Sequence, residues 1–178
     1  MTVDRHIHFR AAAQKLIGDS YLYQGDFENA ATEYKQVLNL SPSDSLSNDA
    51  LDRILLIQSN SDYANVPLEG YVNALKANLS GQPDEALNIC KDTIEAYPQA
   101  LIVDDIWLLI GEIYQNRQAY SDAIEAYEQA FSEQSLVAAE ALTEIADIYY
   151  RQLRDATKAL QTYRTLIQNY PESVIVPY

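Results

Sequence analysis

The chain is poor in cysteine, which cross-links small secreted proteins, and in glycine and proline, which interrupt helices. It is also poor in the basic residues that bind phosphate. Its 178 residues include one cysteine, five glycines and six prolines, with 12 Lys and Arg against 26 Asp and Glu. A single cysteine excludes an internal disulfide. No stretch reaches the roughly 18 consecutive apolar residues that a membrane-spanning helix needs, and the first residues, MTVDRHIHFR, lack the apolar segment of a secretion signal. We therefore expect no direct membrane insertion.

The acidic excess lies in the middle of the chain. Between Leu55 and Tyr150 there are 16 acidic and three basic residues, whereas the two ends together have ten acidic and nine basic residues. A negative field of this size repels phosphate backbones, so the composition argues against a nucleic-acid partner. Two interpretations stay open: a solvated acidic surface, or a surface that attracts a basic partner.

Residues 107–131 carry two stripes of small and apolar residues that predict a pair of helices. Spacings of one, three and four residues put each stripe on one helix face. The first stripe is Trp107, Ile110, Gly111 and Tyr114, and the second is Ala123, Tyr127 and Ala130. Residues 116–120 are few enough to turn the chain back, and the glycine lets the partner helix approach closely.

This pattern resembles the tetratricopeptide repeat, W-x2-L-G-x2-Y followed by A-x3-F, with Ile for Leu and Tyr for Phe. It covers residues 104–137, recurs well in 11–44 and 139–172, and recurs weakly in 67–100. The resemblance implies an all-α fold, a right-handed superhelical α-solenoid of about nine helices. We expect one tetratricopeptide-like domain over residues 1–178, as a fragment of a longer chain.

The intervals between the repeats predict one irregular segment. Ala30 and Ala86, at equivalent positions, are 56 residues apart, whereas the next two intervals, to Ala123 and Ala159, are 37 and 36 residues. We predict an inserted helix near 44–60, within an irregular insert over residues 45–66; whether the insert forms one helix or two stays open. The turn of the last repeat is one residue longer than the turn of the repeat before it.

Several residues that are often reactive or ligating occupy packing positions of the repeats. Cys90 takes an aromatic position, so we expect a small buried side chain rather than a nucleophile. Six tyrosines are predicted to be core rather than a cofactor site. These are Tyr21, Tyr34, Tyr114, Tyr127, Tyr149 and Tyr163.

Candidate chemistry for an enzyme is weak. The sequence has no nucleophile–base pair, phosphate-binding loop or dinucleotide fingerprint. His6 and His8 are two residues apart and point in different directions on a helix. Asp104 and Asp105 with Glu112 suggest a divalent metal, but acids at a helix start also favour the helix dipole. We expect no enzymatic activity, no cofactor and no metal; a hydrolase using acidic residues is the alternative from another class.

The resemblance implies that the protein is a scaffold. Members of the family hold a peptide or helix of another protein on a surface lined by the first helix of each repeat. A well-known ligand of the family is a C-terminal carboxylate, bound by a clamp of Lys, Asn and Arg. Lys15 occupies the first clamp position, but Asp19 replaces the asparagine. A carboxylate ligand would meet carboxylates here, so we do not expect this ligand.

The same projection predicts a partner-binding groove that is acidic. Beside Lys15 and Asp19, its residues from the last two repeats are Asp105, Leu108, Glu112, Gln115, Glu140, Thr143, Asp147 and Tyr150. We predict that it binds a segment with Lys or Arg among apolar residues. Affinity would come from burying Leu108 and Tyr150, and the carboxylates would set specificity and association rate.

The end of the chain offers an alternative function. The apolar tail, residues 173–178, is not followed by the polar capping helix that closes most solenoids. Either the chain was cut from a longer protein, or this end docks on another copy and makes a homo-oligomer. The Tyr-Pro endings at 97–98 and 170–171 are similar to bacterial cell-envelope members of the family. This leaves the cytoplasm, the periplasm and the cell envelope open as locations.

Overall fold

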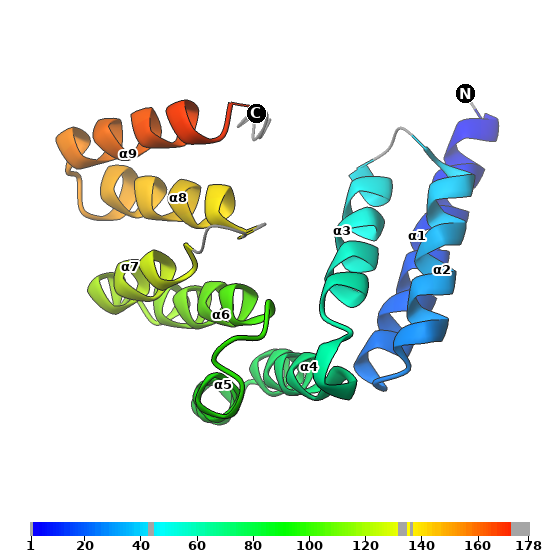
Figure 1. Cartoon of the computed structure of the whole chain (residues 1–178). Helices are drawn as coiled ribbons and strands as arrows, with labels where there is room; N and C mark the ends of the chain where they lie inside the picture. Colours follow the sequence, from blue (N-terminus) through cyan, green and yellow to red (C-terminus); the bar gives the residue numbers. More distant parts are fainter. Residues whose placement is uncertain (1, 43–44, 132–134, 136, 172–178) are drawn as a thin grey trace. The chain divides into compact units, whose positions relative to one another are not determined.

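The computed structural model describes residues 2–42, 45–131, 135 and 137–171. Within these ranges the regular elements are nine α-helices, one 3-10 turn (η1) and one π-helical turn (η2), with no strand (Figure 1). In chain order they are α1 (Thr2–Tyr23), α2 (Phe27–Leu40), α3 (Ser45–Ser59), η1 (Asp62–Asn65), α4 (Val66–Leu79), α5 (Pro83–Ala96), α6 (Val103–Asn116), α7 (Tyr120–Gln129), α8 (Ala138–Asp147), η2 (Ile148–Gln152) and α9 (Ala156–Asn169). The all-α prediction is confirmed.

The chain divides into two compact units, Met1–Lys76 and Ala77–Tyr178, which we describe separately. In the described part of the chain, every helix is too short or too polar to cross a bilayer. The predicted single domain and the handedness of the superhelix stay predictions. The apolar tail lies outside the described residues.

The first unit is built on the pair α1 and α2, and α3 packs against α2 and also touches α1 (Figure 1). Its core consists of small and apolar side chains that are at most 7% exposed: Ala11, Leu22, Phe27, Ala30, Tyr34, Val37, Ala50, Ile54 and Ile57. The insert is therefore one helix, α3, followed by the short turn η1. This answers the question that the sequence left open.

The second unit packs α5 on α6 and then continues with the pairs α6–α7 and α8–α9 (Figure 1). Its main core cluster joins α6, α7, α8 and the π-helical turn: Leu108, Ala123, Ile124, Tyr127, Ala130, Ala141, Ile145 and Ile148. Trp107 and Tyr114 are partly buried against this cluster. The two stripes predicted in residues 107–131 therefore pack as expected.

Three of the turns within helix pairs close in the same way, a left-handed residue after the helix end with two backbone hydrogen bonds. After α1, the N–H of Gly25 (φ +78°) donates to the carbonyl of Leu22 over 3.0 Å, and the next N–H donates to Tyr21 over 3.0 Å. Gly81 makes the equivalent turn after α4, and Gln118 (φ 61°) makes it after α6. Glycine at the first two turns predicts a left-handed residue from the sequence, whereas glutamine at position 118 does not.

The extra residue of the last repeat is absorbed by η2. The N–H of Leu153 donates to the carbonyl of Ile148 over 3.0 Å, five residues back, which is π-helical bonding. The turn then closes from Asp155 to the carbonyl of Tyr149 over 2.8 Å, six residues back instead of five. The insertion thus widens one helical turn and leaves Ala159 buried at its repeat position.

The connection between α3 and α4 is strained. Tyr63, Ala64 and Asn65 have φ values of 53°, 55° and 64°. This left-handed region costs roughly 1–2 kcal/mol for residues such as tyrosine and alanine, and less for asparagine. Val66 is right-handed helical (φ −57°, ψ −44°) directly before Pro67, where this conformation is sterically disfavoured. The residue types of this connection do not predict this conformation.

Cys90 and two of the six tyrosines predicted to be core are buried, whereas the other four tyrosines are not fully buried. Cys90 is 0% exposed, and burial raises the pKa of its thiol to about 12, so it is an inert core residue. Tyr34 and Tyr127 are fully buried. The other four tyrosines predicted to be core are only partly buried, because a repeat position fixes where a ring packs and not what covers its outer edge.

The glycine of each well-matched repeat is required by the tyrosine of its partner helix. A Cβ atom built at Gly111 lies 2.4 Å from the Cδ1 atom of Tyr127, and one built at Gly18 lies 2.6 Å from the Cε1 atom of Tyr34. Real Cβ atoms do not approach ring carbons this closely. The ring therefore packs directly on the backbone of the first helix.

We predict that Gly111→Ala destabilises the protein by roughly 1–3 kcal/mol, because the ring or the helix must move. Without the clash, the same change inside a helix would stabilise by about 0.5–1 kcal/mol. Urea unfolding measures the difference. In a double-mutant cycle with Tyr127→Leu the penalty should largely disappear; a penalty that persists would contradict the ring contact.

Candidate functional site

The predicted groove residues of the second unit differ in how far they reach solvent. Glu112 and Glu140 are exposed, and Tyr150 is 57% exposed. Four others are partly buried: Asp105, Gln115, Thr143 and Asp147. The hydroxyl of Thr143 donates within its own helix to the carbonyl of Ala139 over 2.8 Å, so it is already engaged.

One of these residues, Gln115, binds the hydroxyl of the buried Tyr127. This hydroxyl donates to Oε1 of Gln115 over 2.9 Å, and Nε2 of Gln115 donates to Oε2 of Glu144 over 2.9 Å. Burial, and then the charges of Glu144, Glu112 and Glu140, raise the pKa of Tyr127 far above its usual range. We call Glu112, Gln115, Glu140 and Glu144 the acidic face.

Glu144 was missed by the sequence projection. It follows Glu140 by four residues, so both lie on one face of α8. The repeat pattern predicts Thr143 and Asp147 at the groove instead. The spacing of four was available in the sequence, but only the bond from Gln115 on α6 shows that Glu144 turns toward the neighbouring helix.

Leu108 does not reach the groove. It is 8% exposed and belongs to the core cluster with side chains of α7 and α8. The prediction that its burial provides affinity is therefore wrong, since a residue covered by neighbouring helices has little apolar surface left to give. Of the two apolar groove residues, Tyr150 alone is exposed.

Asp147 is held by its own repeat. It accepts a hydrogen bond of 2.6 Å from the hydroxyl of Tyr163 on α9, and its other oxygen lies 3.3 Å from Nε of Arg151. Burial of Tyr163 and its hydrogen bond to Asp147 raise the pKa of this tyrosine to about 12. The carboxylate of Asp147 thus binds α8 to α9 and is not a free ligand.

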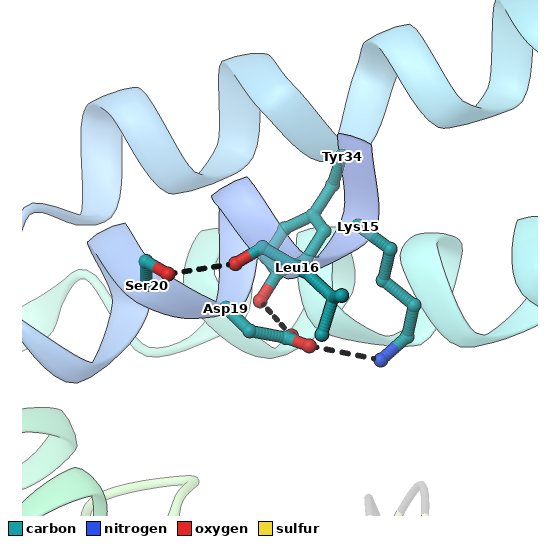
Figure 2. Close-up of polar contacts among 5 residues, drawn as sticks. All are labelled: Lys15, Leu16, Asp19, Ser20 and Tyr34. Atoms are coloured by element: carbon teal, nitrogen blue, oxygen red, sulfur yellow. Dashed lines mark hydrogen bonds and ion pairs between the residues drawn. The ribbon is translucent and has the colours of Figure 1, made fainter. Parts of the chain in front are cut away.

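Lys15 and Asp19 belong to the first unit, and the structure joins them to each other. Nζ of Lys15 lies 3.1 Å from Oδ2 of Asp19, and the hydroxyl of Tyr34 donates to Oδ1 of Asp19 over 2.7 Å (Figure 2). Each of the two charged side chains is 20% exposed. Asp19 and Asp147 occupy the same repeat position and accept from the same tyrosine position.

The acidic residues do not converge on a metal. Among the described residues, no group of three or more His, Cys, Asp or Glu side chains is arranged to hold an ion. The side chains of the acidic face instead line two neighbouring helices.

We predict that the free energy of unfolding falls as the pH rises from about 10, the ordinary tyrosine value, to about 12. The folded protein holds the proton of Tyr163 more tightly than the unfolded chain does. The stabilisation is therefore complete below pH 10 and lost as the pH approaches 12. Denaturant titrations at several pH values should give a shallower decline for Tyr163→Phe; equal slopes would contradict the assignment.

Comparison with known proteins identifies the repeat. Two family models, both described as tetratricopeptide repeat, match residues 13–44 and 108–174. Together they cover 99 of the 178 residues. No curated protein sequence gives a significant match. A solved structure, "Crystal structure of MamA protein", is similar with a TM-score of 0.47 and 21% identity, over 94% of this chain and 98% of that one.

Proposed function

This chain belongs to the tetratricopeptide-repeat family, and on that premise we propose that it is a non-enzymatic scaffold that holds a basic peptide or helical segment of another protein on its acidic face. Domains of this family generally mediate protein–protein interaction. The observation that carries the proposal is the hydrogen bond from Gln115 of α6 to Glu144 of α8, because it joins the two helices that carry the exposed Glu112 and Glu140.

Charge gives this surface its selectivity. Glu112 and Glu140 are exposed, so a Lys or Arg of a partner can reach them without desolvating a buried pair. Each such pair contributes only about 0–1 kcal/mol. The negative field of the region around them raises the association rate of cationic ligands and repels anionic ones.

Affinity needs apolar contact, and Tyr150 and Leu153 supply it at the end of α8. They are 57% and 46% exposed and lie in or next to the π-helical turn. The ring of Tyr150 can cover an aliphatic side chain or stack under a cation. The partner segment would thus carry an apolar residue beside its basic ones.

We predict that Glu112→Lys/Glu140→Lys weakens binding of a fluorescein-labelled peptide of alternating lysines and leucines by about tenfold or more, because it replaces two attractions with two repulsions. Fluorescence anisotropy measures Kd. Binding to the wild type should weaken with salt, and the same peptide with glutamates for lysines should not bind.

The matched control is Glu125→Lys/Glu128→Lys, which makes the same change of charge at exposed positions of α7. It should retain most of the affinity. Equal loss in both variants would mean that only net charge matters, and an unchanged Kd in the first variant would refute the acidic face as the binding surface.

Self-association end to end is the second candidate. On α9, Leu160 and Ile167 are 52% and 69% exposed, and on α1, Phe9 and Leu16 are 64% and 65% exposed. α9 is the second helix of its pair and α1 the first of its own. The α1 helix of one copy can therefore take, on α9 of another, the place of the first helix of a following pair, which gives an open series of copies.

We predict that Leu160→Asp/Ile167→Asp abolishes concentration-dependent growth in light scattering, because the apolar contact is replaced by buried charge. Leu79→Asp changes a residue that is 70% exposed at the end of α4 and is the control. Growth that survives in the first variant, or a wild type that stays monomeric, would eliminate this candidate.

A further inference from the structure

The last helix of the second unit, α9, is cationic in a chain that is acidic as a whole. It carries Lys158 and Arg164 and no acidic residue, and Arg151 and Arg154 lie in and after the π-helical turn before it. The whole chain has 26 acidic and 12 basic residues. α9 packs on α8 and η2 (Figure 1). Its charge attracts it to acidic surfaces of the kind that the rest of the chain carries.

One stripe of α9 places a base between two apolar side chains. Leu160, Arg164 and Ile167 follow one another at intervals of four and three residues, so they lie on one face of the helix. Leu160 and Ile167 are 52% and 69% exposed, and Arg164 is exposed. We call these three residues the cationic stripe. Its composition is the one that the acidic face selects, a cation beside apolar groups.

The cationic stripe is not covered within its own copy. Other residues fix α9 to α8: Ala159 is buried, and the hydroxyl of Tyr163 donates to Asp147 over 2.6 Å. Arg164 makes no ion pair with any carboxylate of the residues that the structure describes. The charge and the apolar area of the stripe are therefore left for contact with another molecule.

We propose that the acidic face of one copy binds the cationic stripe of a second copy. This inference rests on the proposed function, because it names the chain itself as the occupant of the same surface. Arg164 would pair with Glu112 or Glu140, which are both exposed. The apolar side chains of the stripe would cover Tyr150 and Leu153, which are 57% and 46% exposed. The contact thus combines electrostatic selectivity with burial of apolar area.

The two surfaces are different, so the contact is heterologous. Each copy uses its acidic face for one neighbour and its cationic stripe for another, which gives a ring if the rotation closes and an open series if it does not. Leu160→Asp/Ile167→Asp should therefore stop growth here as in the end-to-end contact with α1. Charge separates the two contacts, because Glu112 and Glu140 take part only in the contact proposed here.

Light scattering over a concentration series tests the contact by reversing the charge on either side. Growth of the wild type should weaken with salt. Glu112→Lys/Glu140→Lys and Arg164→Glu should each raise the apparent Kd of association by about tenfold or more, because each replaces attraction by repulsion. All three reversals in one chain should restore association, because the two surfaces then have opposite charges again. Circular dichroism checks that each variant keeps its helices.

The matched controls make the same changes of charge away from both surfaces. Glu125→Lys/Glu128→Lys reverses two exposed acids of α7, and Lys91→Glu reverses one exposed base of α5. Both should leave the apparent Kd unchanged. Equal losses in the controls, or no recovery in the chain with all three reversals, would refute the pairing of the stripe with the acidic face.

Two further outcomes would assign the surfaces to other occupants. Growth that Phe9→Asp/Leu16→Asp abolishes and Glu112→Lys/Glu140→Lys retains would assign the cationic stripe to α1 and overturn the proposal. A wild type that is monomeric at every concentration but binds the lysine–leucine peptide would overturn the contact between copies and leave the proposed function standing. Absence of both growth and peptide binding would refute the acidic face itself.

Discussion

The contact on which both units depend is that of a tyrosine ring packed directly against the backbone of its partner helix. Tyr34 on Gly18 and Tyr127 on Gly111 bring the two helices closer than any side chain at the glycine would permit. Both rings are fully buried, and the apolar core follows from this close approach. In the last repeat Ala146 stands at the glycine position, and Tyr163 is only partly buried there.

A buried tyrosine also has a hydroxyl that needs an acceptor, and this need determines the roles of the acidic residues. Asp19 and Asp147 accept from Tyr34 and Tyr163, so these carboxylates hold helix pairs together. In the middle repeat Gln115 accepts instead. Glu112, which has the position of Asp19 and Asp147, is exposed.

Departures from the repeat are accommodated by backbone conformation rather than by loss of the pairs. One extra residue becomes a π-helical turn between α8 and α9. One inserted helix, α3, packs on α2 and is followed by a left-handed reversal of residues with side chains. The π-helical turn keeps its backbone hydrogen bonded, whereas the left-handed residues after α3 are strained. Such strain persists only where the surrounding structure holds the backbone in place.

The sequence by itself determined the helices, their pairing, the inserted helix and the burial of Cys90, because spacings of three and four residues and the glycine–tyrosine pattern are local. Only the tertiary structure decided that Leu108 is buried, that Glu144 joins Glu112 and Glu140, and that Asp147 is held by Tyr163. Periodicity assigns a residue to a face of its own helix, but the exposure and charge of that face depend on which other helices cover it. The left-handed conformations of Gln118 and Ala64 could not be predicted from the sequence, because their side chains disfavour this conformation.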